Sequence, residues 1–232
     1  LDPRGPRPSI ETLLHAFLPQ ASVVHSHADA ILSLTNSRDP QEAVLKAYGN
    51  DVIMVPYRRP GFLLSKEVAI AALGHPGVKG IVLLNHGLVT CDTSPKKSYD
   101  THIELVTRAE EHIRKRSMGK VIFGGTRVPS LEQGERRRTA AAVTPSLRAM
   151  VSSGSNRRML LRFDDSPEVL EFVNCKMVRE LTEAGAATPD HLLHIKRTPL
   201  LVEVRDSSYV GDLRRALVDG VERYHKTYED WF

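Results

Sequence analysis

The sequence is poor in cysteine and has no long hydrophobic run. Its two cysteines, Cys91 and Cys175, lie far apart, so we expect neither a disulfide framework nor a Cys-x-x-Cys metal knuckle. No apolar stretch approaches the roughly 20 residues that a membrane-spanning helix needs, and no secretory leader is visible. We therefore expect a soluble protein of the reducing cytoplasm, with no membrane partner.

Aromatic residues are also scarce, at 6% of the 232 residues, and the net charge at neutral pH is only +4. The basic excess lies in three short clusters: Arg114-Lys115-Arg116, Arg136-Arg137-Arg138 and Arg157-Arg158. Nucleic-acid surfaces combine such side chains with a broad basic face and stacking aromatics. We therefore interpret the clusters as solvated helix ends and expect no nucleic-acid partner, although an anion-binding role is the alternative.

The remaining composition is that of a globular protein, with 41% hydrophobic and 26% charged residues. In the first half, short apolar runs alternate with helical patterns, which predicts an α/β domain with a layered sheet. The expected strands are 21–27, 51–56 and 79–84, and the expected helices are 9–18, 28–36, 65–73 and 95–115.

The helix 95–115 has the clearest periodicity. Its predicted packing face consists of apolar side chains at helical spacing: Tyr99, Ile103, Val106, Ala109 and Ile113. Its two histidines, His102 and His112, are expected on the surface of the helix or at an interface.

A shift to Gly, Pro and polar residues over 119–134 predicts a long connection. We therefore divide the chain into an N-terminal domain, 1–125, and a smaller C-terminal α/β extension, 126–232. In the extension we expect helices at 135–151, from Pro167 onward and at 209–232, and strands at 158–163 and 199–204.

Two histidines follow a pair of valines in Val23-Val24-His25-Ser26-His27. Because residues i and i+2 of a strand point to the same face, a strand here would place both imidazoles side by side. His86 follows the apolar run 79–84, and the next residue, Gly87, is where we expect a strand to turn into a loop. Three imidazoles with an open position are typical of catalytic zinc sites. The alternative is that each histidine is an ordinary core or edge residue.

Metal-assisted chemistry at carbon also needs a proton carrier near the ion. Glu11 is the candidate, because a helix packed back on the strand could bring its carboxylate to the histidines. A glutamate in the first turn of a helix can equally serve only to stabilise the helix dipole.

A second histidine pair, His191 and His194, lies in Asp190-His191-Leu192-Leu193-His194. At positions i and i+3 of a helix these side chains could ligate a metal. Because the pair flanks two leucines, partly buried packing is the more ordinary interpretation.

Three motifs resemble the class II aldolase/adducin family in their order and context: Pro8-Ser9-Ile10-Glu11, His25-x-His27, and Asn85-His86-Gly87-Leu88 before a long helix. L-fuculose-1-phosphate and L-rhamnulose-1-phosphate aldolases typify this family. The longer strings 6–19, 99–111 and 188–202 are similar to the aldolase part of bacterial proteins that fuse such a region to a short-chain dehydrogenase. The resemblance covers most of the chain and implies a three-layer α/β/α domain.

The resemblance implies that His25, His27 and His86 bind zinc and that Glu11 is the catalytic acid/base. Zinc would bind carbonyl and hydroxyl oxygens of the substrate and stabilise the enediolate left when a carbon–carbon bond breaks. Three histidines would also accept another divalent ion, such as cobalt, manganese or nickel.

The resemblance further implies that Ser9, Asn85 and Gly87 contribute to substrate binding. In the family, an N-terminal Gly-Asn-Ser/Thr segment and a serine pair before the glutamate hold the substrate phosphate. The present chain begins after the first of these segments and has Ile10 at the second serine position. It has no Gly-x-x-x-Gly-x-Gly loop after a strand, so we expect no NAD binding.

We therefore expect a zinc-dependent lyase of carbohydrate metabolism that cleaves a ketose 1-phosphate, of rhamnulose or fuculose type, to dihydroxyacetone phosphate and an aldehyde. Epimerases, dehydratases and decarboxylases that share the three-histidine signature are the first alternative. A non-catalytic, adducin-like interaction module is the second, although such modules typically do not retain all three histidines. The resemblance also implies a homo-oligomer, commonly a tetramer in the family.

Overall fold

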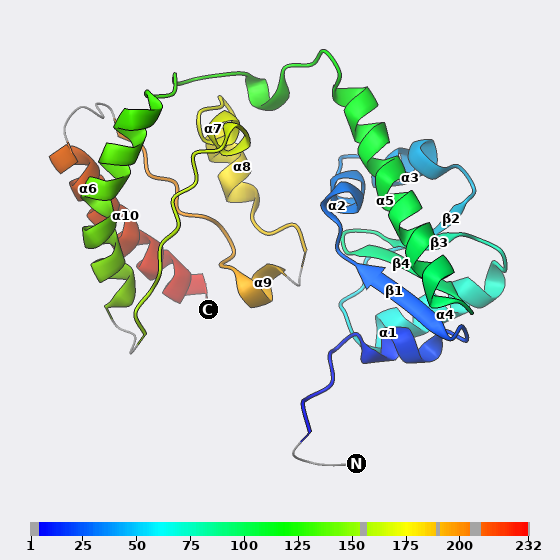
Figure 1. Cartoon of the computed structure of the whole chain (residues 1–232). Coiled ribbons are helices and arrows are strands. Elements are labelled where there is room, and N and C mark those ends of the chain that lie inside the picture. The colour runs from blue at the N-terminus through cyan, green and yellow to red at the C-terminus, as the bar shows by residue number, and fades with distance from the viewer. Residues whose placement is uncertain (1–4, 154–156, 189–190, 205–209, 232) are drawn as a thin grey trace. The chain divides into compact units, whose positions relative to one another are not determined.

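Two units divide the chain, and the computed structural model describes residues 5–153, 157–188, 191–204 and 210–231 of it. The first unit spans Leu1–Lys120 and Ala186–Ile195 (Figure 1). The second spans Val121–Gly185 and Lys196–Phe232. The division at residues 125 and 126 that composition suggests stays a prediction.

A four-stranded mixed sheet forms the centre of the first unit. Its strands are β1 (Ser22–Ser26), β2 (Val52–Val55), β3 (Gly80–Leu83) and β4 (Gly87–Asp92), in the order β1-β4-β3-β2. Strand β4 pairs antiparallel with both β1 and β3, whereas β2 runs parallel to β3. The first three strands lie in the expected runs. After Gly87 the sequence predicts a loop, but β4 begins there, so that expectation is wrong.

Helices cover both faces of the sheet, and this confirms the predicted α/β/α layers. One face carries α2 (Asp29–Thr35), α3 (Pro40–Tyr48) and α5 (Pro95–Ser117), and the other carries α1 (Thr12–Phe17) and α4 (Phe62–Gly74). A separate hydrophobic core lies on each face of the sheet. Side chains alternate along β3, so Val82 packs in one core while Ile81 and Leu83 pack in the other. Because β3 is buried on both faces, its sequence is a continuous apolar run instead of an alternation of apolar and polar residues.

Helix α3 is absent from the sequence prediction. The Asp39 side chain accepts a hydrogen bond from the backbone N–H of Glu42 at 3.1 Å, and Pro40 occupies the first turn. An aspartate N-cap followed by proline is a recognised helix start, so the signal was present in the sequence.

Helix α5 forms as predicted, and its predicted packing face is confirmed in part. Its buried side chains are Ser98, His102, Leu105 and Ala109. Of the predicted face, Val106, Ala109 and Ile113 pack on the core, whereas Tyr99 and Ile103 are exposed. The expectation that His102 lies on the surface is therefore wrong.

Helices joined by irregular segments form the described part of the second unit. It contains η1 (Ile122–Gly124), α6 (Gln133–Ser152), α7 (Pro167–Val173), α8 (Val178–Ala184) and α10 (Val210–Trp231), while α9 (His191–His194) belongs to the first unit. Helices α6 and α10 pack together. The strands expected at 158–163 and 199–204 are wrong, because neither described segment pairs in a ladder. An apolar run forms a strand only where a neighbouring backbone is available for pairing.

Across the described ranges, no helix combines the length and the apolar composition that a bilayer crossing requires.

Candidate metal centre

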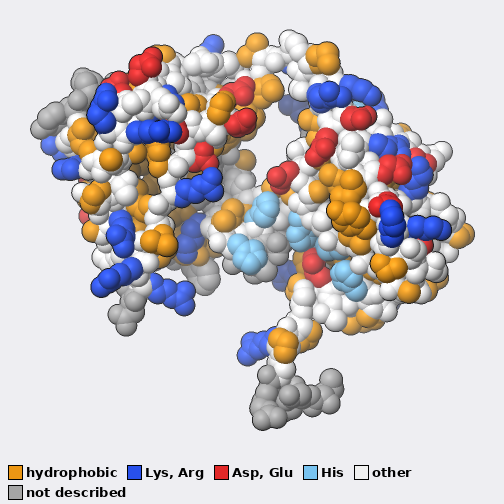
Figure 2. Space-filling model, viewed as in Figure 1, with side chains coloured by type: hydrophobic (Ala, Val, Ile, Leu, Met, Phe, Trp, Pro, Cys, Tyr) orange, Lys and Arg blue, Asp and Glu red, His pale blue; other side chains and the backbone are white. Residues whose placement is uncertain are grey.

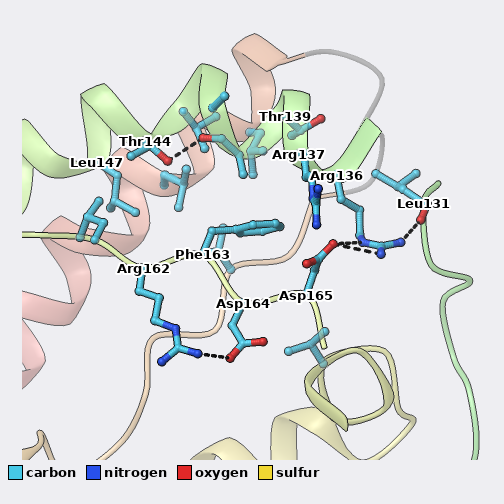
Figure 3. Close-up of a pocket in the computed structure, with 18 of the residues that line it drawn as sticks. Leu131, Arg136, Arg137, Thr139, Thr144, Leu147, Arg162, Phe163, Asp164 and Asp165 are labelled. Carbon is cyan, nitrogen blue, oxygen red and sulfur yellow. Dashed lines mark hydrogen bonds and ion pairs between the residues drawn. The ribbon is translucent and has the colours of Figure 1, made fainter. Parts of the chain in front are cut away.

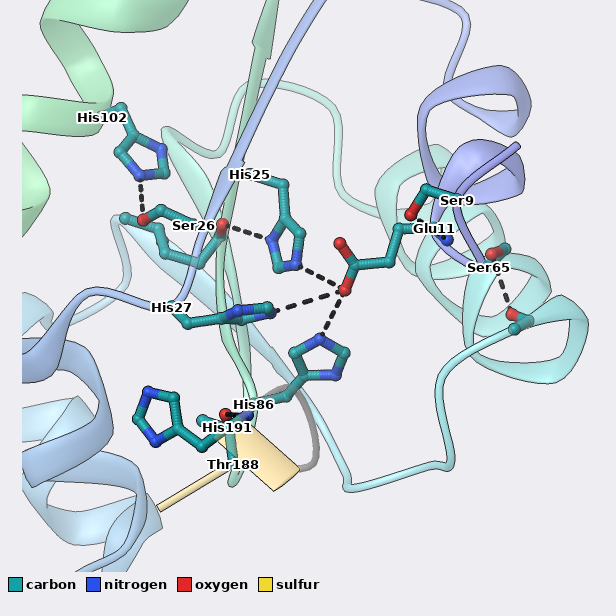
Figure 4. Close-up of polar contacts among 12 residues, drawn as sticks. Ser9, Glu11, His25, Ser26, His27, Ser65, His86, His102, Thr188 and His191 are labelled. Carbon is teal, nitrogen blue, oxygen red and sulfur yellow. Dashed lines mark hydrogen bonds and ion pairs between the residues drawn. The ribbon is translucent and has the colours of Figure 1, made fainter. Parts of the chain in front are cut away.

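Three imidazoles converge on one carboxylate oxygen in the first unit (Figure 4). Oε1 of Glu11 lies 3.2 Å from Nε2 of His25, 3.4 Å from Nε2 of His27 and 3.0 Å from Nε2 of His86. The four candidate ligand atoms all lie within 4.8 Å of one another. Figure 2 shows histidine side chains gathered at the surface of this unit, with acidic side chains beside them. The cluster could hold a metal ion.

The local fold explains how these side chains meet. His25 lies in β1 and His27 directly follows it, and their ring centroids are 4.8 Å apart, as strand alternation predicts. His86 lies in the turn between β3 and β4, with its ring centroid 4.9 Å from that of His27. Glu11 directly precedes α1, whose packing on α4 fixes the start of the helix beside the sheet.

Glu11 is the most exposed member of the cluster, with 23% of its side chain accessible to solvent. Hydrogen bonding to His25 first, and then to His27 and His86, holds the pKa of the Glu11 carboxyl far below its usual range. The group is therefore a carboxylate across the physiological pH range, while it keeps access to solvent.

The tautomer of His25 shows that the cluster favours a cation. Its Nδ1 lies 2.9 Å from the carbonyl oxygen of Leu88, which can only accept a hydrogen bond, so Nδ1 must donate. In the neutral ring, the lone pair of Nε2 then faces the Glu11 carboxylate, and two acceptors cannot bond to each other. A proton or a metal ion resolves this conflict. Three imidazole nitrogens and a carboxylate are a donor set that fits a divalent cation such as zinc.

Gly87 is required by close packing next to the cluster. A Cβ atom at this position would lie 2.3 Å from the carbonyl oxygen of Ser26, and about as close as a van der Waals contact allows to the rings of His25 and His27. Real Cβ atoms essentially never approach another heavy atom as closely as the first of these distances. The glycine therefore lets β4 approach β1 and the two histidines.

Asn85 adopts a left-handed backbone conformation, with φ of 57°, immediately before His86. Its side-chain amide donates hydrogen bonds to the carbonyl oxygen of Thr35 at 3.1 Å and to Oδ1 of Asn36 at 2.9 Å. These bonds tie the turn that carries His86 to the end of α2. Asparagine tolerates this conformation better than most residues.

Ser9 is exposed, and its hydroxyl accepts a hydrogen bond from the backbone N–H of Glu11 at 3.1 Å. It therefore stabilises the turn that precedes α1. The substrate-binding roles of Ser9, Asn85 and Gly87 stay predictions.

A segment from the second half of the chain borders the same unit. The Asn36 side chain donates a hydrogen bond to the carbonyl oxygen of Ala187 at 2.7 Å, and Thr188 is buried. The backbone N–H of His191 bonds to Oγ1 of Thr188 at 3.2 Å (Figure 4). His191 is half-buried and His194 is exposed. Among the described residues, the cluster that could hold a metal includes neither of them.

The second unit contains a cavity of about 850 Å³ (Figure 3). It is lined mainly by apolar side chains of α6, α7 and α10, such as Val143, Val169 and Leu217. At its edge Arg136 is paired with Asp165 at 3.1 Å, which neutralises both charges. Within the described residues, no cluster of metal-ligating side chains lies in this cavity.

Comparisons with known proteins agree with the motifs. A family model described as "Class II Aldolase and Adducin N-terminal domain" matches residues 1–113, and one described as "Aldolase class II, second domain" matches residues 138–232. Together the two models cover most of the chain.

Among curated proteins, "Uncharacterized oxidoreductase YuxG" of Bacillus subtilis (strain 168) is 39% identical over 236 residues. The match includes all of this chain but only 34% of that protein, so the chain spans about a third of its relative.

Two solved structures are also similar. The N-terminal class II aldolase domain of a conserved protein from Thermoplasma acidophilum has 51% identity and a TM-score of 0.45, over 49% of this chain and 52% of that one. A sugar-phosphate aldolase from Thermotoga maritima has 20% identity and a TM-score of 0.43, over 50% of this chain and 57% of that one.

Proposed function

The chain belongs to the class II aldolase and adducin family, and on this premise we propose that it is a zinc-dependent aldolase. The proposed reaction cleaves a ketose 1-phosphate, of rhamnulose or fuculose type, to dihydroxyacetone phosphate and an aldehyde. The observation that carries the proposal is the convergence of His25, His27 and His86, through Nε2, on Oε1 of Glu11.

His25, His27 and His86 would hold the ion through Nε2. When bound, a divalent cation supplies positive charge that stabilises negative charge developing on substrate oxygens as a carbon–carbon bond breaks. The carbonyl of Leu88 fixes the His25 ring so that Nε2 faces the centre. Zinc is the expected ion, although three imidazoles would also accept cobalt, manganese or nickel.

Glu11 would transfer the proton that carbon–carbon cleavage requires. When the bond between the third and fourth carbons breaks, the electron pair stays on the third carbon and that carbon takes up a proton. The hydroxyl on the fourth carbon loses its proton as the aldehyde forms, so no net proton is consumed. In the condensing direction the Glu11 carboxylate would take that proton from the third carbon, and its conjugate acid would return it in cleavage.

The other properties implied by the family are part of the same proposal. We infer a cytoplasmic homo-oligomer that acts on a small sugar phosphate and does not bind NAD, nucleic acid or membranes. Helix α4 supports self-association, because Leu63, Ile70 and Leu73 follow helical spacing and are 66%, 59% and 70% exposed. Contiguous exposed apolar side chains commonly mark protein interfaces.

A test of the reaction begins with the zinc-loaded chain and L-rhamnulose 1-phosphate or L-fuculose 1-phosphate. Release of dihydroxyacetone phosphate, detected by coupled reduction with NADH, is the expected result. Formation of an epimer, or loss of water or carbon dioxide, without triose phosphate would favour the epimerase, dehydratase or decarboxylase alternative. A chain that binds no metal and turns over no substrate would favour the non-catalytic module.

A further inference from the structure

A buried hydrogen-bonded chain lies behind the metal centre. Ser26 sits between the two histidines of the β1 segment, and strand alternation directs its side chain to the opposite face. There its Oγ lies 2.6 Å from Nε2 of His102 (Figure 4). His102 is only 4% exposed, and its Nδ1 lies 3.1 Å from Oγ1 of Thr90 in β4. The chain therefore connects β1, α5 and β4.

The protons in this chain have one consistent arrangement. Thr90 donates its single hydroxyl proton to the carbonyl oxygen of Ser98 at 2.9 Å. Its oxygen must therefore accept from His102, so Nδ1 of His102 carries the proton. Burial, followed by the nearby His25, lowers the pKa of His102 to about 4, which keeps the ring neutral. Nε2 of the neutral ring can only accept, so the Ser26 hydroxyl donates to it.

The position of Ser26 is held from two directions. Its side chain is bound by His102, and its carbonyl oxygen is in close contact with Gly87. Within the described sheet, strand β1 lies at the edge and pairs with β4 alone, so it has fewer backbone hydrogen bonds to fix it than a central strand has. The two histidines that flank Ser26 depend on the same stretch of backbone.

We propose that Ser26 and His102 are positioning residues that hold β1 in the geometry with which His25 and His27 bind the metal. This inference rests on the proposed metal function of those histidines. Hydrogen bonds that orient ligating side chains directly typically contribute about 10–100-fold to metal affinity, and Ser26 and His102 would act on the ligands through the backbone of β1.

The test measures zinc affinity by competition with a chelator and the absorption spectrum of the cobalt-loaded chain. In Ser26→Ala we expect zinc affinity about 10–100-fold below that of the unaltered chain, together with a shifted cobalt spectrum. Ser26→Thr keeps the hydroxyl and should restore both properties. If Ser26→Ala does not fold, Ser26→Cys retains only a weak donor and serves the same comparison.

Ser98→Ala is the matched control. Ser98 is also buried at the contact between α5 and β4, and its hydroxyl donates to the carbonyl oxygen of Thr90 at 3.1 Å. This substitution should lower the resistance to urea while zinc affinity stays close to that of the unaltered chain. An equal loss of affinity in Ser98→Ala would overturn the inference, because general packing would then explain both results.

The outcomes separate the inference from the proposed function. An unaltered chain that binds no metal contradicts the proposed function itself. An unaltered chain that binds zinc, with Ser26→Ala matching it in affinity and cobalt spectrum, contradicts only the positioning role of Ser26 and His102.

Discussion

Nε2 of His86 lies 3.0 Å from Oε1 of Glu11, although 75 positions separate these residues in the chain. The contact joins the turn between β3 and β4 to the start of α1, so it depends on the complete fold of the first unit. It also unites a candidate metal ligand with the candidate proton carrier, which gives the two residues distinguishable phenotypes.

Substitution His86→Ala should remove metal and activity together, because it deletes one of three imidazole ligands. Elemental analysis should find about one zinc per chain in the unaltered protein and almost none in the variant. His75→Ala is the control, since His75 is exposed and its ring bonds to the carbonyl oxygen of Ala71. Full metal content in His86→Ala would contradict the proposed ligand set.

Substitution Glu11→Gln should keep the metal and lose turnover. The amide has nearly the shape of the carboxylate but cannot accept and return a proton. General acid–base groups typically contribute about 10²–10⁴-fold to rate, and we expect a loss of kcat in this range at unchanged zinc content. A variant that retained the full rate would show that Glu11 is not the proton carrier.

Substitution Gly87→Ala should destabilise the first unit, because the new methyl group would overlap the carbonyl of Ser26. Overpacking of this kind costs about 1–3 kcal/mol in free energy of unfolding, measured by urea titration. Gly74→Ala is the matched control, because a methyl group added there would have no atom within 4 Å and the φ of Gly74 is not positive. Equal stability of the two variants would contradict the packing role of Gly87.

Stability should fall as the pH decreases from about 6.5 to about 4, in part because of His102. The folded chain keeps this ring neutral, with a pKa near 4, while the unfolded chain takes up a proton near the ordinary value of 6.5. The unfolded state therefore binds more protons in this window, which lowers the free energy of unfolding as the pH falls. Above the window the ring is neutral in both states, so this loss of stability is absent. Urea titrations at several pH values across the window should show a smaller decrease in the free energy of unfolding for His102→Gln than for the unaltered chain. Parallel curves would contradict the assignment.

The double substitution Leu63→Glu and Leu73→Glu should reduce self-association. Both side chains are exposed on α4, and a charge buried in an apolar interface is costly unless it is paired. Sedimentation or light scattering should show a lower mass for the variant, with unchanged helical content. The double substitution Lys96→Gln and Lys97→Gln on α5 is the control, because it changes the net charge by the same amount. An unchanged mass would place the interface elsewhere.

Local patterns were sufficient to predict that the three histidines lie close together. Strand alternation alone brings His25 and His27 together, and the apolar run before His86 supplies the second strand end. The meeting of Glu11 with the histidines depends on how α1 packs, and the sequence offered only the proximity of a helix start. The roles of these residues as ligands and acid/base stay predictions.

His102 was misplaced for a physical reason. Hydrophobicity defined the predicted face of α5, but a histidine and a serine occupy the buried face because Ser26 and Thr90 satisfy their polar atoms. Positions 98, 102, 105 and 109 do follow helical spacing, so the stripe is visible once polar residues are allowed in it. The partners themselves come from distant strands, and helical periodicity carries no information about them.

The expected strands of the second unit failed for a related reason. Apolar composition indicates that a segment such as 158–163 favours an extended conformation, but a strand also requires a partner backbone. Pairing is a property of the whole fold, and nothing within the segment specifies it.

The hydrogen bond between Asn36 and Ala187 has a consequence for biosynthesis. The first unit takes its residues from both sides of 121–185, so no cut at a single peptide bond separates the two units. A fragment ending at residue 120 would leave the Asn36 amide without the carbonyl that it binds in the whole chain. A ribosome adds residues from the N-terminus onward, so the first unit cannot be completed until 186–195 has emerged from the exit tunnel. Folding of the candidate metal centre in its final surroundings therefore requires the segment 186–195 as well as residues 1–120.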